Sequence, residues 1–171
     1  MFMCLSRPGD MLLPVGNLAL GYPREPEYPK RKGYFIMTVT TTVFQWIARI
    51  VGVIILILGI TIWTGSADFL IPIHMLLGIT IVLTLWILAV LAAISGVSAG
   101  LVALAFVWGL IVLLLGLTQT QILPEPNPFH WTIQVAHLLI GLGAIGQAEN
   151  LARRIKSLKK LAIQRTQPAS R

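Results

Sequence analysis

Long apolar runs separated by short polar loops dominate the chain. Four runs almost exclude charged side chains, at about residues 43–63, 71–94, 98–118 and 129–148. Each approaches the ~20 residues that a helix needs to cross ~30 Å of hydrocarbon. The pattern predicts an all-α integral membrane protein, with an up-and-down bundle of four transmembrane helices within residues 37–150.

The composition agrees with a membrane protein. Of the 171 residues, 56% are hydrophobic and 11% are charged, whereas soluble domains carry about 25% charged residues. The net charge of +7 is not accompanied by a nucleic-acid-binding motif, so nucleic acid is not an expected partner. The lipid bilayer is the expected partner, and a membrane protein or redox partner is a further candidate.

The first 36 residues differ from the rest of the chain. They hold five of the ten prolines and show no periodic apolar pattern, so we expect residues 1–36 to be disordered. A second interpretation starts from Lys30-Arg31-Lys32-Gly33. These residues can be encoded by purine-rich codons, and such a run of bases resembles a bacterial ribosome-binding site just before Met37. Met37 would then be the true start, and residues 1–36 an upstream extension outside the native protein.

The residues after the last apolar run form a basic tail, 151–171. Seven basic residues and no acidic ones follow Glu149. Leu151, Ile155 and Leu158 recur at helical spacing among them, which predicts a surface helix on anionic lipid.

The distribution of charge also predicts the orientation. The loops around Asp68 and Glu125 contain no Lys or Arg, in contrast to the tail. By the positive-inside rule, both termini are cytoplasmic and these two loops are external. We expect a multi-pass protein of the cytoplasmic (inner) membrane.

The two halves of the chain resemble one another. Leu58-Gly59-Ile60-Thr61 ends the first run and Leu115-Gly116-Leu117-Thr118 ends the third. His74-Met75-Leu76-Leu77-Gly78 in the second run matches His137-Leu138-Leu139-Ile140-Gly141 in the fourth. Their shared order predicts two copies of one helical hairpin, with both histidines towards the outer side.

The matched histidines are the main candidates for function. Ionisable side chains within spans are costly and mark functional sites by default. Helices two and four lie diagonally across such a bundle, so His74 and His137 can approach one ligand from opposite sides. A b-type haem fits that arrangement, and Gly78 and Gly141, one turn further on, leave a gap for its ring.

Other interpretations of these residues stay open. A histidine near a span end can simply lie at the membrane interface, and a glycine often serves close helix packing. Pro72 and Pro128 also suggest that His74 and His137 differ in depth by about 9 Å. His130 is therefore a second candidate, either as a ligand or as a polar group near the haem propionates.

A family resemblance is consistent with the haem interpretation. The pattern of 58–61, Thr64-Gly65 and 74–77 resembles the helical hairpin of the haem A synthase family, over about residues 50–150. It implies a single four-helix half with haem-ligating histidines at His74 and His137. The family's catalytic half has an acidic residue and a histidine in its first outer loop. Here only Asp68 is present, so synthase activity is not expected.

The sequence leaves two classes of function. No GxSxG, Walker glycine loop or HExxH motif is present, so an autonomous enzyme is not expected. One hypothesis is a small cytochrome b-like protein for electron transfer or haem handling. The alternative is a non-catalytic membrane subunit or assembly factor without a cofactor.

One further pair is a structural candidate. Arg49 in the first run and Glu149 after the fourth belong to neighbouring helices of the predicted bundle, and an ion pair between them would offset the cost of burying either charge. Alternatively, Arg49 reaches lipid phosphates and Glu149 reaches water.

Overall fold

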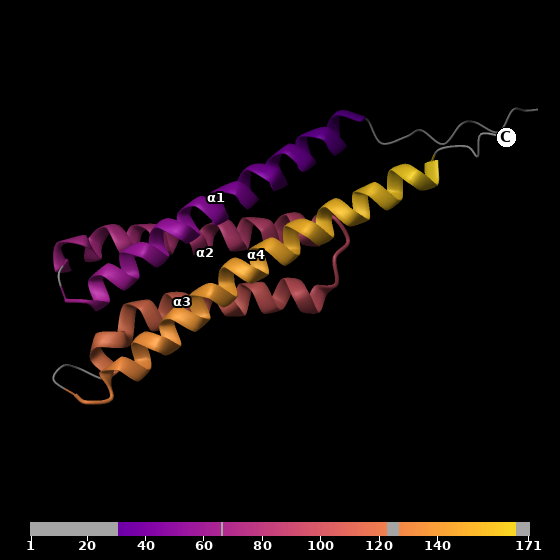
Figure 1. Ribbon diagram of the computed structural model, residues 1–171. Helices are drawn as coiled ribbons and strands as arrows, with labels where there is room; N and C mark the ends of the chain where they lie inside the picture. The colour runs from indigo at the N-terminus through magenta and orange to yellow at the C-terminus, as the bar shows by residue number, and fades with distance from the viewer. Residues whose placement is uncertain (1–30, 66, 123–126, 167–171) are drawn as a thin grey trace, which may run out of the picture.

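The protein is built from helices joined by short turns (Figure 1). The computed structural model describes residues 31–65, 67–122 and 127–166, and no strand occurs among them. The elements are α1 (Arg31–Trp63), the short 3-10 helix η1 (Asp68–Leu70), α2 (Ile71–Ile94), α3 (Ala99–Ile122) and α4 (His130–Thr166).

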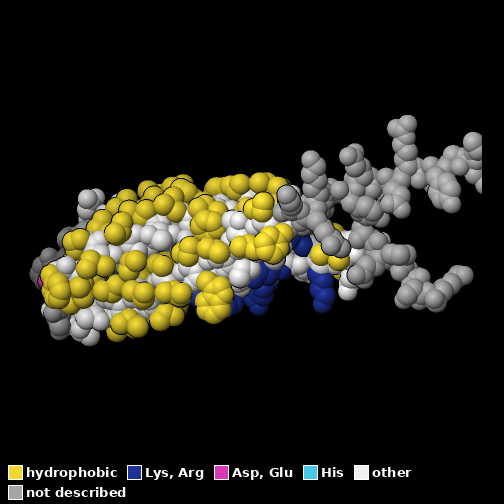
Figure 2. All heavy atoms as spheres, turned by 90° about the horizontal axis from the view of Figure 1, so that it is seen from above, with side chains coloured by type: hydrophobic (Ala, Val, Ile, Leu, Met, Phe, Trp, Pro, Cys, Tyr) yellow, Lys and Arg dark blue, Asp and Glu magenta, His cyan; other side chains and the backbone are white. Residues whose placement is uncertain are grey.

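Three of the helices are long and apolar enough to cross a membrane. These candidate spans are Phe35–Trp63, Asp68–Ile94 and Ala99–Thr118. Hydrophobic side chains cover most of the visible surface of the bundle (Figure 2), which is the surface that a bilayer would contact. The first half of α4 carries Gln134, His137 and Gln147, and α4 is not one of the three.

The helices run alongside one another in alternating directions, so α2 and α4 point the same way (Figure 1). The helix α2 packs against α1, α3 and α4, and α4 also packs against α1 and α3. Within the described residues α1 and α3 do not pack on one another, so α2 and α4 form the short diagonal of the bundle. The four-helix bundle is thus present, whereas its origin from a duplicated hairpin stays a prediction.

Small side chains fill the centre of the bundle. Ala89 and Ala92 of α2, and Ala144 and Ala152 of α4, have no exposed surface. Small residues let helix backbones approach closely, which is the main source of helix association in lipid. Leu85 adds a large, fully buried side chain to the same core.

The turn between α2 and α3 explains why these helices are antiparallel neighbours. Gly96 has φ +81°, in the left-handed region that favours glycine. The Val97 N–H donates to Ala92 O at 3.0 Å and the Gly96 N–H to Ala93 O at 3.1 Å. This is a Schellman motif, which ends α2 sharply and satisfies its last carbonyls.

The first and last helices, α1 and α4, are longer than the sequence predicted. Residues 31–36 belong to α1, although we expected disorder throughout 1–36; residues 1–30 lie outside the described part. The helix α4 continues through Thr166 instead of ending in a separate surface helix. Leu151 and Ile155, expected on lipid, are buried in the core, because α1 and α4 cover one another there.

Two tryptophans connect neighbouring helices at glycines. The Trp86 indole N–H donates to Phe106 O at 3.3 Å, and the Trp108 indole N–H donates to Ile140 O at 2.9 Å. A Cβ added at Gly143 would lie 2.7 Å from Trp108 Cζ2. The indole can therefore reach the α4 backbone only because this position has no side chain.

We predict that Gly143→Ala destabilises the bundle. The added methyl overlaps the Trp108 ring, and overpacking of this kind costs about 1–3 kcal/mol. Gly146→Ala is the matched control on the same helix, because a Cβ there meets nothing within 4 Å. Thermal unfolding of both variants in detergent measures the difference, and equal midpoints would contradict the prediction.

Candidate cofactor site

Two histidines from the diagonal helices face one another. His74 lies in the first turn of α2 and His137 in the second turn of α4. Their ring centroids are 6.2 Å apart and their planes are inclined by 49°. Since α2 and α4 run in the same direction and pack together, residues near both helix starts lie at the same end of the bundle.

Each imidazole lies against a glycine of the preceding helix. A Cβ at Gly59 of α1 would be 3.2 Å from His74 Cε1. A Cβ at Gly116 of α3 would be 3.3 Å from His137 Cε1. Both distances are tighter than an ordinary carbon contact, so any side chain at these glycines would displace the ring. The two histidines are therefore positioned in the same way by different helices.

The ring nitrogens are available for a ligand. His74 Nδ1 and His137 Nδ1 are buried and have no hydrogen-bond partner within the described part of the chain. Buried polar atoms are almost always partnered in native proteins. Imidazole nitrogens bind protons, hydrogen-bond partners or metal ions, so this pair has the capacity to coordinate a metal.

The number of ligands limits which metal group can bind. The described residues contain no group of three or more His, Cys, Asp or Glu that could hold a metal ion. Zinc sites use three or four protein ligands. A haem iron already has the ring nitrogens and needs only axial ligands from the protein, such as imidazole. Two histidines match the number of axial ligands that a haem iron can take from a protein.

The spacing of the rings also fits one metal between them. A metal–nitrogen bond of about 2.1 Å, with about 1.1 Å from nitrogen to ring centre, places two axial imidazole centroids about 6.4 Å apart. The observed separation is 6.2 Å. The separation of the ring centres alone thus matches one metal held between two imidazoles, while the unpartnered Nδ1 atoms lie on the ring edges next to Gly59 and Gly116.

The other candidate residues, Gly78, Gly141 and His130, differ in their surroundings and in their distance from this pair. A Cβ at Gly141 meets nothing within 4 Å, and one at Gly78 meets only Ile55 Cδ1, at 3.6 Å. His130 is the first residue of α4, about 10.5 Å along the axis from His137. The histidines matched by the repeat, His74 and His137, are the pair whose rings lie together. Their role as ligands stays a prediction.

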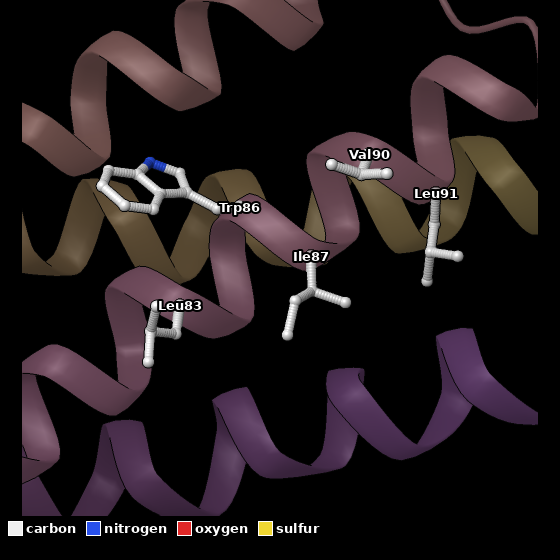
Figure 3. Close-up of a pocket in the computed structure, with 5 residues that line it drawn as sticks. All are labelled: Leu83, Trp86, Ile87, Val90 and Leu91. Atoms are coloured by element: carbon white, nitrogen blue, oxygen red, sulfur yellow. The ribbon is translucent and has the colours of Figure 1, made fainter.

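A groove elsewhere on α2 is a poor alternative site for a cofactor. Leu83, Trp86, Ile87, Val90 and Leu91 line about 250 Å³ of almost wholly apolar space (Figure 3). Leu83 is already nine residues beyond His74, or about 13.5 Å along the helix. The groove offers no ligand atoms and is suited to lipid chains.

The expected pair of Arg49 and Glu149 is confirmed. Arg49 donates from Nε and Nη2 to the two carboxylate oxygens, the second bond at 3.0 Å. Gln45 Nε2 donates to Glu149 Oε2 at 2.7 Å, and Lys156 Nζ donates to Gln45 Oε1 at 2.6 Å. Sequence reasoning missed Gln45, although a glutamine one turn before an arginine in an apolar run was a usable signal.

The comparisons with known proteins found no relatives. No family model, no curated protein and no solved structure matches this chain. The functional conclusion therefore depends on the geometry of the histidine pair.

We predict that Arg49 and Glu149 are energetically coupled. Arg49→Gln or Glu149→Gln alone leaves one charge without its partner, so the double variant should be less harmful than the sum of the singles. Thermal unfolding in detergent gives the comparison. Arg154→Gln combined with Glu149→Gln is the control, because Arg154 contacts Asn150 instead, at 3.2 Å. Strict additivity for Arg49 and Glu149 would indicate independent residues.

Proposed function

We propose that this protein is a small cytochrome b-like membrane protein that binds b-type haem through His74 and His137, for electron transfer or haem handling. The observation that carries the proposal is the facing pair of imidazoles at 6.2 Å. Two ligands at this spacing match the axial requirement of one haem iron.

The surroundings of the histidines support the same proposal. Gly59 and Gly116 hold the two rings in matching positions. The space beside Gly141 leaves one side of the α4 helix open next to His137, where a flat ring can lie. In this proposal His130, two turns towards the helix start, lies on the side of the propionates.

The protein residues would set the properties of the bound group. A haem with two imidazole ligands supplies low-spin, one-electron redox chemistry. His74 and His137 are partly buried among apolar helices, and burial is one of the ways in which a protein adjusts a haem potential. None of the described residues near the pair suggests a substrate reaction, and we therefore prefer electron transfer or haem handling to enzymatic activity.

We further propose that α4 is the fourth span and that both termini are cytoplasmic. From His130 to Glu149 the helix rises about 28 Å, close to the hydrocarbon thickness. This segment packs against all of the other three helices. Lys and Arg side chains gather at one end of the bundle (Figure 2), which the positive-inside rule places in the cytoplasm. The histidine pair then lies towards the outer side of an inner membrane.

Haem binding is tested by absorption of the purified full-length protein. We expect a Soret band and a low-spin spectrum after reduction, from cells supplied with haem precursors. His74→Ala and His137→Ala should each abolish the band or convert it to high-spin, because each removes one axial ligand. Wild-type protein that folds as helix and lacks a Soret band would leave the cofactor-free membrane subunit as the better hypothesis.

Two variants define the position of the haem more closely. His130→Ala should keep the low-spin spectrum, because His130 is not an axial ligand in this arrangement. Gly141→Ala should leave the helical fold intact, since a Cβ there meets nothing within 4 Å, and should weaken haem binding if the ring lies beside it. A Gly141→Ala protein with unchanged haem affinity would place the ring elsewhere.

The orientation is tested by labelling single cysteines in intact cells. In a Cys4→Ser background, Asp68→Cys should react with an impermeant reagent added outside, and Ser170→Cys should react only after lysis. Labelling of Ser170→Cys in intact cells would reverse the orientation.

A further inference from the structure

A basic cavity lies between α1 and α4, at the end opposite the histidines. It is open on one side and has a volume of about 380 Å³. Its lining residues are Thr38, Lys156, Lys159, Lys160, Ile163 and Gln164. Three of these side chains are lysines, and none is acidic. The cavity therefore has a concentrated positive charge.

Lys159 is the unusual member of this lining. It is only 8% exposed, and its Nζ lies 3.5 Å from Thr38 Oγ1, a long and weak hydrogen bond. Burial lowers the pKa of Lys159, because desolvation disfavours the ammonium form. An ammonium group in this position would gain more than an exposed lysine from an anion in the cavity.

The described part of the chain does not supply that anion. Its acidic residues are Asp68 and Glu149. Asp68 begins η1, beside the histidines at the other end, and Glu149 is bound by Arg49 and Gln45. The positive charge of the cavity is therefore not balanced by either of these carboxylates.

We propose that this cavity binds the phosphate group of an anionic membrane lipid. Three ammonium groups can donate charge-assisted hydrogen bonds to one phosphate. The cytoplasmic leaflet, where this end of the bundle is proposed to lie, carries anionic lipids that attract basic residues. The site is separate from the haem site and does not depend on haem binding.

The rim of the cavity favours a lipid over a free phosphate ion. Ile163 lines it with 54% of its surface exposed. On α1, Phe35 and Val39 lie on either side of Thr38 in the sequence and are 71% and 44% exposed. Apolar side chains beside a phosphate site suit the glycerol and acyl parts of a lipid, whereas a free anion would make no use of them.

The site is also connected to the ion pair of the bundle. Lys156 both lines the cavity and donates to Gln45 Oε1, and Gln45 in turn donates to Glu149. A phosphate held between Lys156 and Lys159 of α4 and Thr38 of α1 would join these two helices near the end of α2, where Ser95 Oγ lies 3.9 Å from Met37 Sδ. Lipid binding should therefore raise the thermal stability of the whole bundle.

The test compares the effects of two lipids and one inorganic anion on the stability of the full-length protein in a non-ionic detergent. Short-chain phosphatidylglycerol, short-chain phosphatidylcholine and inorganic phosphate are titrated while the thermal unfolding midpoint is measured. We expect a saturable rise with phosphatidylglycerol and little change with the other two. An equal rise with inorganic phosphate would overturn the lipid assignment, and an equal rise with phosphatidylcholine would overturn the selection of an anionic lipid.

Variants separate a built site from general charge attraction. Lys159→Met should fold, since it replaces a desolvated ammonium by an apolar chain, and should weaken phosphatidylglycerol binding about five-fold. Lys160→Gln, at an exposed lysine of the same lining, should act in the same direction. Arg154→Gln removes one charge from the same helix outside the lining and should leave the affinity unchanged. Equal weakening by Arg154→Gln, or unchanged affinity in both lysine variants, would contradict the proposal.

Discussion

The close approach of α2 and α4 is the constraint on which the other features depend. In lipid there is no hydrophobic force between apolar helices, so association relies on packing that small residues permit. The alanines of the core, such as Ala89 on α2 and Ala144 on α4, are completely buried. Because these two helices share the centre, α1 and α3 are placed on opposite flanks. The same approach brings the rings of His74 and His137 together near the helix starts.

Hydropathy predicted the middle of the chain well and its ends less well. The second apolar run coincides with α2, and the third begins one residue before α3. The helix at residues 31–36 was missed, and the helix expected beyond Glu149 was placed on the lipid surface, whereas Leu151 and Ile155 are buried in the core. An apolar pattern cannot distinguish burial against another helix from contact with lipid. The start of α1 and the end of α4 pack against one another, and Thr41 on α1 and Ile155 on α4 are both fully buried. Such pairing depends on residues more than a hundred positions apart, which local sequence cannot reveal.

The pairing of the two histidines was predictable because they lie in a repeated motif. The residues that position their rings were not predictable. Gly59 and Gly116 stood in the other repeated motif, and only the register between helices shows that they face the imidazoles. His74 lies three residues into α2 and His137 seven residues into α4, a difference of four residues or about 6 Å along a helix axis. The expected difference in depth of about 9 Å does not keep the rings apart, since their centroids are 6.2 Å from each other.

The two interfaces between the hairpins give an independent reason to regard the histidines as a pair. If the hairpin was duplicated, as the motifs predict, Arg49 corresponds to Phe106 and Glu149 to Trp86. One interface is then held by an ion pair, and the corresponding one by an indole donating to Phe106 O. The two corresponding interfaces are thus stabilised by different kinds of interaction. At the histidine end both halves keep an imidazole against a glycine. Packing alone does not demand that identity, so its retention after a duplication is consistent with the proposed ligand, which needs two like groups.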